Sequence, residues 1–193
     1  MVVMLAPKNA LSFGAGTLLY ASIGTALPDY TIVNSIFTGP WGAGWNLLGV
    51  TREGHDFTIE MDSEEVEVAE YLDPVANVIT GRNVGMEFEL LQLHATNMRR
   101  VFNGGTLTTS GSGTTLRTTY KLPQPGQEIR CMIGWESTDQ TERIVAQQAF
   151  QVGSVSISRK KGAANAGLPV SFKFEPDANG DPFLHDFAGA LRG

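Results

Sequence analysis

The chain has 193 residues, of which 42% are hydrophobic and 18% are charged, and its net charge is −6 at pH 7. These values suit one well-buried globular domain and exclude a wholly disordered chain. The acidic balance argues against a protein that grips nucleic acid by its phosphates, because such proteins carry a basic face.

The N-terminal quarter of the sequence predicts an arm, a strand and a loop. Residues 1–15 contain Pro7 and Gly14 and are followed by Gly16, and we expect them to form an N-terminal arm. A strand is predicted over 16–24, which has a glycine at each end. Residues 38–46 are rich in turn formers and hold Trp41 and Trp45, which either close the end of a core or mark a contact surface.

The next segment is strongly acidic and has a strand pattern. Apolar and acidic residues alternate through HDFTIEM and again through EEVEVAEY, which predicts two strands with one buried face each. We expect a hairpin turn at Asp62 and Ser63 between them, and a break in the pattern at Pro74 and Gly81. Nine carboxylates and no Lys or Arg occur between residues 53 and 73: Glu53, Asp56, Glu60, Asp62, Glu64, Glu65, Glu67, Glu70 and Asp73.

A strand and then a short helix are predicted after this segment. Residues 83–90 alternate, with Glu87 and Glu89 opposite an apolar face. From Ala95 the apolar spacing becomes that of an amphipathic helix. His94 or Thr96 lies near its start, two arginines lie near its end and Gly104 fits a C-terminal stop. Two helical turns are unstable alone, so this helix must pack on the sheet.

The rest of the chain predicts further strands. A Ser/Thr/Gly hairpin is expected over 106–122, and two strands, 127–137 and 143–152, flank a polar turn at 138–141. In the second of these, five side chains are expected on one face: Ile144, Ala146, Gln148, Phe150 and Val152. A strand at 155–158 is expected to pair with the final strand through a Gly/Ala loop.

Residues 177–193 are expected to form a C-terminal extension. This tail carries Phe183, Phe187 and Leu191, which could dock on a neighbouring molecule. The run DANGD at 177–181 has its glycine too early for an EF-hand calcium loop, and no closing glutamate follows, so we expect an Asx-type turn there.

Motifs for catalysis or cofactor binding are missing from the sequence. There is no phosphate-binding loop, no complete dinucleotide fingerprint and no G-x-S-x-G elbow. The three histidines lie far apart, and Cys131 is the single cysteine, which we expect to be a small buried residue in a strand. A catalytic carboxylate pair in the acidic segment is conceivable, but acids that alternate along a strand more often face solvent. We therefore expect no enzyme activity, no cofactor and no metal.

These elements predict a mainly β fold, a β-sandwich or half-barrel with one short flanking α-helix, in a single domain over 1–193. Such a sheet has edges, which can pair with another chain. No apolar run approaches the length that spans a membrane, and the start MVVMLAPKNAL lacks the charged lead-in of a signal peptide, so we expect a soluble product with no membrane partner.

One long part of the sequence is similar to a known family. It comprises WNLLGVTREGHDFTIEMDSEEVEVAEYLDPVANVITGR and the following MEFELLQLHATNMRRVFNGG. Together these resemble the major tail proteins, or tail tube subunits, of long-tailed phages, especially those that infect actinobacteria. Trp135 with Glu136 and the later LPVSFKFEPD agree more loosely. The resemblance covers roughly residues 40–185.

This resemblance implies the phage tail tube fold and a structural role in the virion. In that family, subunits form hexameric rings that stack into a hollow tail tube with an often acidic bore, through which phage DNA is ejected. The implied partners are other copies of the chain and the tape-measure and tail terminator or tip proteins, with DNA only as passing cargo. The protein would be made in the bacterial host cytoplasm. A virion decoration protein or a carbohydrate-binding β-sandwich with Trp41 and Trp45 as its platform is the alternative, and an enzyme is a third hypothesis.

The resemblance also suggests two sets of positions. The segment 72–82 lies where such proteins place a long loop between subunits, which makes candidate inter-subunit contacts of Leu72, Asp73, Pro74, Val75, Ile79 and Arg82. Arg82, Arg99 or Arg100 could pair with acids across an interface. The candidate acids facing the lumen are Glu65, Glu67, Glu87 and Glu89.

Overall fold

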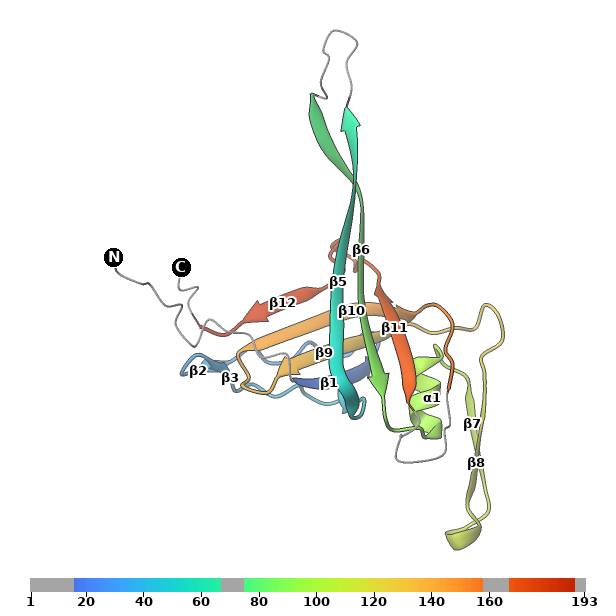
Figure 1. Cartoon of the computed structure of the whole chain (residues 1–193). Coiled ribbons are helices and arrows are strands. Elements are labelled where there is room, and N and C mark those ends of the chain that lie inside the picture. Colours follow the sequence, from blue (N-terminus) through green and yellow to red (C-terminus); the bar gives the residue numbers. More distant parts are fainter. Residues whose placement is uncertain (1–15, 67–74, 158–166, 190–193) are drawn as a thin grey trace.

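The computed structural model describes residues 16–66, 75–157 and 167–189. Its main feature is one antiparallel sheet in the order β4-β1-β9-β10-β11-β6-β5, with β12 paired to β10 (Figure 1). The strands are β1 (Gly16–Ser22), β4 (Asn46–Leu47), β5 (Thr51–Val66), β6 (Ala76–Leu90), β9 (Cys131–Ser137), β10 (Glu142–Gln151), β11 (Leu168–Phe174) and β12 (Leu184–Phe187).

The sheet folds over on itself to make two layers. Strands β5, β6 and β11 cross in front of β1, β9 and β10 in Figure 1. Strand β10 belongs to both layers, since it pairs with β9 and also, near its end, with β11. A β-bulge between Ala146 and Ala149 interrupts its ladder with β9, and bulges of this kind let one strand turn a corner between packed layers. The predicted β-sandwich is therefore confirmed.

The main hydrophobic core lies between the two layers. The buried residues of β6 and β11 alternate along each strand, as expected for strands with one buried face. They meet the buried residues of β1, β9 and β10 in one cluster, whose largest members include Met86, Leu90, Trp135, Phe172 and Phe174.

The predicted helix is confirmed as α1 (Ala95–Val101), and the side chain of His94 caps its start by accepting a hydrogen bond from the Asn97 backbone N–H. Val101 is fully buried in the main core. Just after the helix, Asn103 has a positive φ and its amide exchanges two hydrogen bonds with the Gln151 backbone, at 2.9 and 2.8 Å. These contacts attach the short helix to the end of β10.

Two small hairpins project from this body. The first joins β2 (Ile32–Val33) to β3 (Ile36–Phe37) through two residues with positive φ. The second confirms the predicted Ser/Thr/Gly hairpin: it pairs β7 (Thr106–Ser110) with β8 (Arg117–Lys121), with the short 3-10 turn η2 (Gly113–Thr115) at its tip.

A second cluster covers the outer face of the β1–β9–β10 layer. It contains Leu19, Met132 and Val145 from the strands and Trp45 from the loop, with Trp41 packed against it. Gly134 leaves room for both tryptophan rings, because an added Cβ there would collide with them. This layer is thus buried on both faces.

One buried arginine holds in place the loop that contains Trp41 and Trp45. Arg143 is 2% exposed and pairs with Glu136 at 2.9 Å. It also donates hydrogen bonds to the carbonyl oxygens of Asp29 and Gly39, at 2.8 and 2.7 Å. The indole N–H of Trp41 donates to the same Glu136 carboxylate, so one charge pair joins β9, β10 and the loop.

Four expectations about the strands were wrong. No turn occurs at Asp62 and Ser63: β5 runs straight through them and pairs with β6, with only a shift in register at that point. Residues 76–82, including Gly81, accordingly belong to a strand rather than to an irregular segment. A two-residue polar break in an alternating pattern fits a register irregularity as well as a turn, and only pairing with a distant strand distinguishes them.

The other two errors concern β10 and residue 155 onwards. Ala149 rather than Gln148 continues the core face of β10, because the bulge shifts the alternation after Ala146. Residues 155–157 form no strand, and residue 158 lies outside the described residues. The strand expected to be its partner, β11, pairs instead with β6 and β10.

Several local expectations are confirmed. Cys131 is buried in β9, and burial raises the pKa of its thiol to about 12. Asp177 accepts hydrogen bonds from the backbone N–H groups of Asn179 and Asp181, which is the expected Asx-type turn.

Of the residues predicted as a C-terminal extension, 184–187 add strand β12 to the sheet. Among the described residues, no helix is long and apolar enough to cross a membrane.

Candidate functional site

The candidate site is the outward face of the layer formed by β5, β6 and β11. Since Met86, Phe88 and Leu90 point into the core, the intervening Glu87 and Glu89 point outward. In the register of the sheet Glu87 lies between Asp56 on β5 and Ser171 on β11. Residues directly opposite one another share a face, so the carboxylates of neighbouring strands meet on the solvent side.

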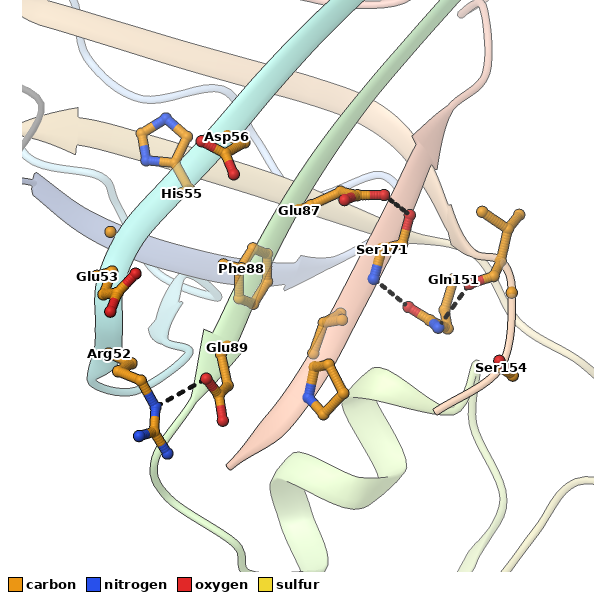
Figure 2. A pocket seen from close by; sticks show the side chains of 15 residues that line it. Arg52, Glu53, His55, Asp56, Glu87, Phe88, Glu89, Gln151, Ser154 and Ser171 are labelled. Atoms are coloured by element: carbon orange, nitrogen blue, oxygen red, sulfur yellow. Dashed lines mark hydrogen bonds and ion pairs between the residues drawn. The ribbon is translucent and has the colours of Figure 1, made fainter. Parts of the chain in front are cut away.

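A shallow open groove of about 590 Å³ lies on this face. Figure 2 shows its acidic side chains, which come from two neighbouring strands: Glu53 and Asp56 from β5, and Glu87 and Glu89 from β6. We call these four residues the acidic face. Arg52 is the one cation among the residues that line the groove.

Two contacts fix the acidic face. The hydroxyl of Ser171 donates a hydrogen bond to Glu87 at 2.9 Å. Arg52 forms an ion pair with Glu89 at 2.7 Å, and both side chains remain more than one third exposed. Within the described part of the chain, Glu53, Asp56 and Glu87 form no ion pair with a cation. The groove is therefore net negative.

His55 lines the same groove on the core side of β5. Its ring packs on that of Trp135, with the ring centroids 4.8 Å apart. Burial lowers the pKa of His55 below its ordinary value, although the nearby carboxylates of Asp56 and Glu142 act in the opposite direction. At neutral pH the imidazole is therefore uncharged and does not offset the acids around it.

The chemistry of the groove is that of a fixed negative field. General acid catalysis needs a carboxyl group enclosed in a pocket, whereas Glu53, Asp56 and Glu87 are exposed. No group of three His, Cys, Asp or Glu residues in the described ranges is arranged to hold a metal ion. A row of exposed carboxylates raises the energy of any phosphate that comes close, so it repels rather than binds nucleic acid.

Of the four acids predicted to face a lumen, the structure brings together only Glu87 and Glu89. Glu65 lies opposite Asn77 and is exposed. It is nine residues along β5 from Asp56, which corresponds to about 30 Å in an extended strand. Glu67 lies outside the described residues.

Those predicted inter-subunit residues that the structure describes lie on a long projection. Beyond the sheet, β5 and β6 continue together as a two-stranded ribbon that stands clear of the body (Figure 1). Val75 and Ile79 are 56% and 60% exposed there, and Arg82 is exposed opposite Met61. Leu72, Asp73 and Pro74 lie outside the described residues.

Sequence reasoning missed Glu53 and Asp56 as members of the acidic face, and Ser171 as the hydrogen-bond partner of Glu87. Asp56 and Glu53 were visible within the acidic run, but the expected turn at residues 62–63 paired the wrong strands. With β5 paired to β6, the register itself places Asp56 opposite Glu87. Ser171 carries no signal in the sequence, since its role depends on the neighbouring strand.

The two tryptophans do not form an exposed platform. Trp45 is buried and its indole N–H donates to the Ala26 carbonyl at 2.9 Å. Trp41 meets Trp45 edge to face and bonds to Glu136. Both rings therefore close the second core cluster, which removes the feature that favoured a carbohydrate-binding module.

The chain was compared with protein-family models and with curated proteins. The model of a family described as phage tail tube protein matches residues 5–185. No curated protein matches the chain. Because the family match spans nearly the whole sequence, the chain belongs to the phage tail tube proteins, structural subunits of the virion that assemble into the tube of the tail.

Proposed function

We propose that this protein is the major tail protein of a long-tailed phage and forms hexameric rings that stack into a hollow tube. The first support is the edge of the sheet. Strand β5 has 16 residues, and within the described part of the chain it pairs on one side only, with β6. A long unpaired edge exposes a row of backbone N–H and C=O groups, which a neighbouring subunit can satisfy by pairing.

The observation that carries the proposal is the position of the acidic face beside this free edge. When neighbouring copies extend the layer of β5, β6 and β11 around a ring, their acidic faces join into one continuous wall. We propose that this wall lines the bore. DNA is then only cargo, because the negative wall repels it and so prevents it from binding during ejection.

The ribbon of β5 and β6 supplies the contacts between adjacent subunits. Its face toward the body carries Phe57 and Met86, and the same face continues outward to Ile59 and Met61, which are 45% and 60% exposed. An apolar stripe that runs beyond its own core is an interface feature. We propose that it docks on a neighbouring copy together with the predicted residues Leu72, Asp73, Pro74, Val75, Ile79 and Arg82.

Other tail proteins complete the assembly. We propose a tape-measure protein inside the tube and terminator and tip proteins at its ends, with assembly in the cytoplasm of the host. The function is mechanical and electrostatic, and it needs neither a catalytic residue nor a cofactor.

The bore assignment is tested by reversing the charge of Glu87 and Glu89 together. We expect phage that carry Glu87→Lys with Glu89→Lys to assemble tails of normal length but to eject DNA poorly, because lysines on the wall bind phosphate. The neutral pair Glu87→Gln with Glu89→Gln is the matched control for lost hydrogen bonds and should be much less impaired. Infectivity equal to wild type in the lysine variant would remove these residues from the bore.

A further inference from the structure

Charge is segregated along this sequence into two blocks of opposite sign. Residues 53–73 hold nine acids and no Lys or Arg. Residues 90–127 hold four cations and no Asp or Glu: Arg99, Arg100, Arg117 and Lys121. The net charge of −6 therefore conceals a strongly acidic block and a purely cationic one.

Part of each block lies on a projection, and the two projections lie at opposite ends of the molecule. Figure 1 shows the ribbon of β5 and β6 projecting from one end and the hairpin of β7 and β8 projecting from the other. We call residues 59–66 with 76–83 the acidic arm, and residues 106–121 the cationic hairpin. The acidic arm contains Glu60, Asp62, Glu64 and Glu65 against a single cation, Arg82.

Neither projection neutralises its charge within the molecule. Glu64 and Glu65 lie opposite Val78 and Asn77, and both acids are exposed. In the cationic hairpin Arg117 lies opposite Ser110 and Lys121 opposite Thr106. None of these four charged residues forms an ion pair inside the described ranges.

We propose that the acidic arm of one copy docks on the cationic hairpin of the next copy along the tube axis. The inference rests on the tube proposed above and adds the chemistry of the contact between successive rings. Because the two surfaces differ and lie at opposite ends, each copy can accept one neighbour and present itself to another, which generates an open stack.

The dimensions and the apolar content of the two projections agree with this contact. Eight residues of β5 span about 26 Å and five residues of β7 span about 17 Å, so the hairpin can lie along the arm. Leu116 beside Arg117 is 59% exposed at the tip of the hairpin, and Val78 beside the arm's acids is 51% exposed. Opposite charges would set the register and the direction of stacking, and such apolar contacts would add affinity.

The test is a charge swap between the two projections. One variant carries Arg117→Glu with Lys121→Glu, and a second carries Glu64→Lys with Glu65→Lys. A third carries all four changes and keeps the net charge of −6. Asp181→Lys, an exposed acid of the C-terminal loop, controls for charge reversal away from both projections. Circular dichroism and urea unfolding confirm that each variant is folded, and negative-stain microscopy with sedimentation measures tube formation.

We expect each two-residue variant alone to raise the protein concentration needed for stacking by at least about tenfold, because like charges then face one another. The four-residue variant, and a mixture of the two failing variants, should again form tubes. Tubes of wild-type length from the Arg117→Glu, Lys121→Glu variant, or a mixture that does not restore stacking, would overturn the inference. Wild-type protein that forms no rings or tubes, even with the partner tail proteins present, would instead contradict the proposed function itself.

Discussion

The layer of β1, β9 and β10 and the ribbon of β5 and β6 use strands in opposite ways. Six of the seven residues of β9 are buried, whereas no residue of the 16 in β5 is. The first layer has apolar clusters on both faces, and Arg143 fastens the covering loop to it. In the ribbon, charged residues and an uncovered apolar stripe both face solvent. We therefore attribute the stability of the subunit to the layer, and we propose that the ribbon makes the contacts between subunits.

Removing the Arg143 side chain should give the largest loss of stability. The substitution Arg143→Ala leaves Glu136 without its cation and strips hydrogen bonds from two carbonyl groups, at an expected cost of about 3–5 kcal/mol. Arg52→Ala breaks the exposed pair with Glu89 in the ribbon's own layer and should cost about 0–1 kcal/mol. Urea unfolding of the two variants measures the difference, and equal losses would contradict the division between layer and ribbon.

Two methionines on one face of the ribbon allow a buried position to be compared with an exposed one. Met86 is fully buried at the base of the ribbon, and Met61 is 60% exposed farther out. We expect Met86→Ala to lower the free energy of unfolding by about 2–5 kcal/mol through the cavity it leaves. Met61→Ala should change it by less than about 0.5 kcal/mol.

The substitution at Met61 should affect tube assembly strongly, although it hardly affects the stability of the subunit. Because the exposed methionine is part of the proposed interface, Met61→Ala should shorten or abolish tubes of a fully stable subunit, as seen by electron microscopy. A Met61→Ala protein that assembles like wild type would remove the apolar stripe from the interface.

The smallest expected effect is a pH dependence at the junction of the two layers, where His55 packs on Trp135. Burial lowers the pKa of His55 in the folded state, so the unfolded chain takes up its proton at the higher, ordinary pKa. The stability tied to neutral His55 is thus present above about pH 6.5 and is lost as pH falls below it. Between pH 7.5 and pH 5, the free energy of unfolding should fall less in His55→Phe than in wild type. Equal decreases in the two proteins would contradict this role of His55.

The sequence predicts features that depend on neighbours a few residues away. The alternation over 83–90, the helix after His94 and the Asx-type turn at Asp177 are all of this kind, and all are confirmed. Each is decided by side-chain spacing or by hydrogen bonds within a few residues. The apolar face of Met86 and Phe88 follows from the same alternation.

Features set by distant pairing were not predictable in this way. The register of β5 against β6, the bulge in β10 and the burial of Arg143 depend on segments far apart in the chain. The same distinction between local and distant effects applies to the candidate site. Glu87 and Glu89 follow from local alternation, whereas their grouping with Asp56 and Ser171 required the sheet register.

The central claim is self-assembly, and negative-stain electron microscopy of the purified wild-type protein tests it most directly. The account predicts six-fold rings or hollow tubes, which form alone or on addition of the partner tail proteins. A protein that remains a monodisperse monomer across concentration and salt, and also in the presence of those partners, would contradict it.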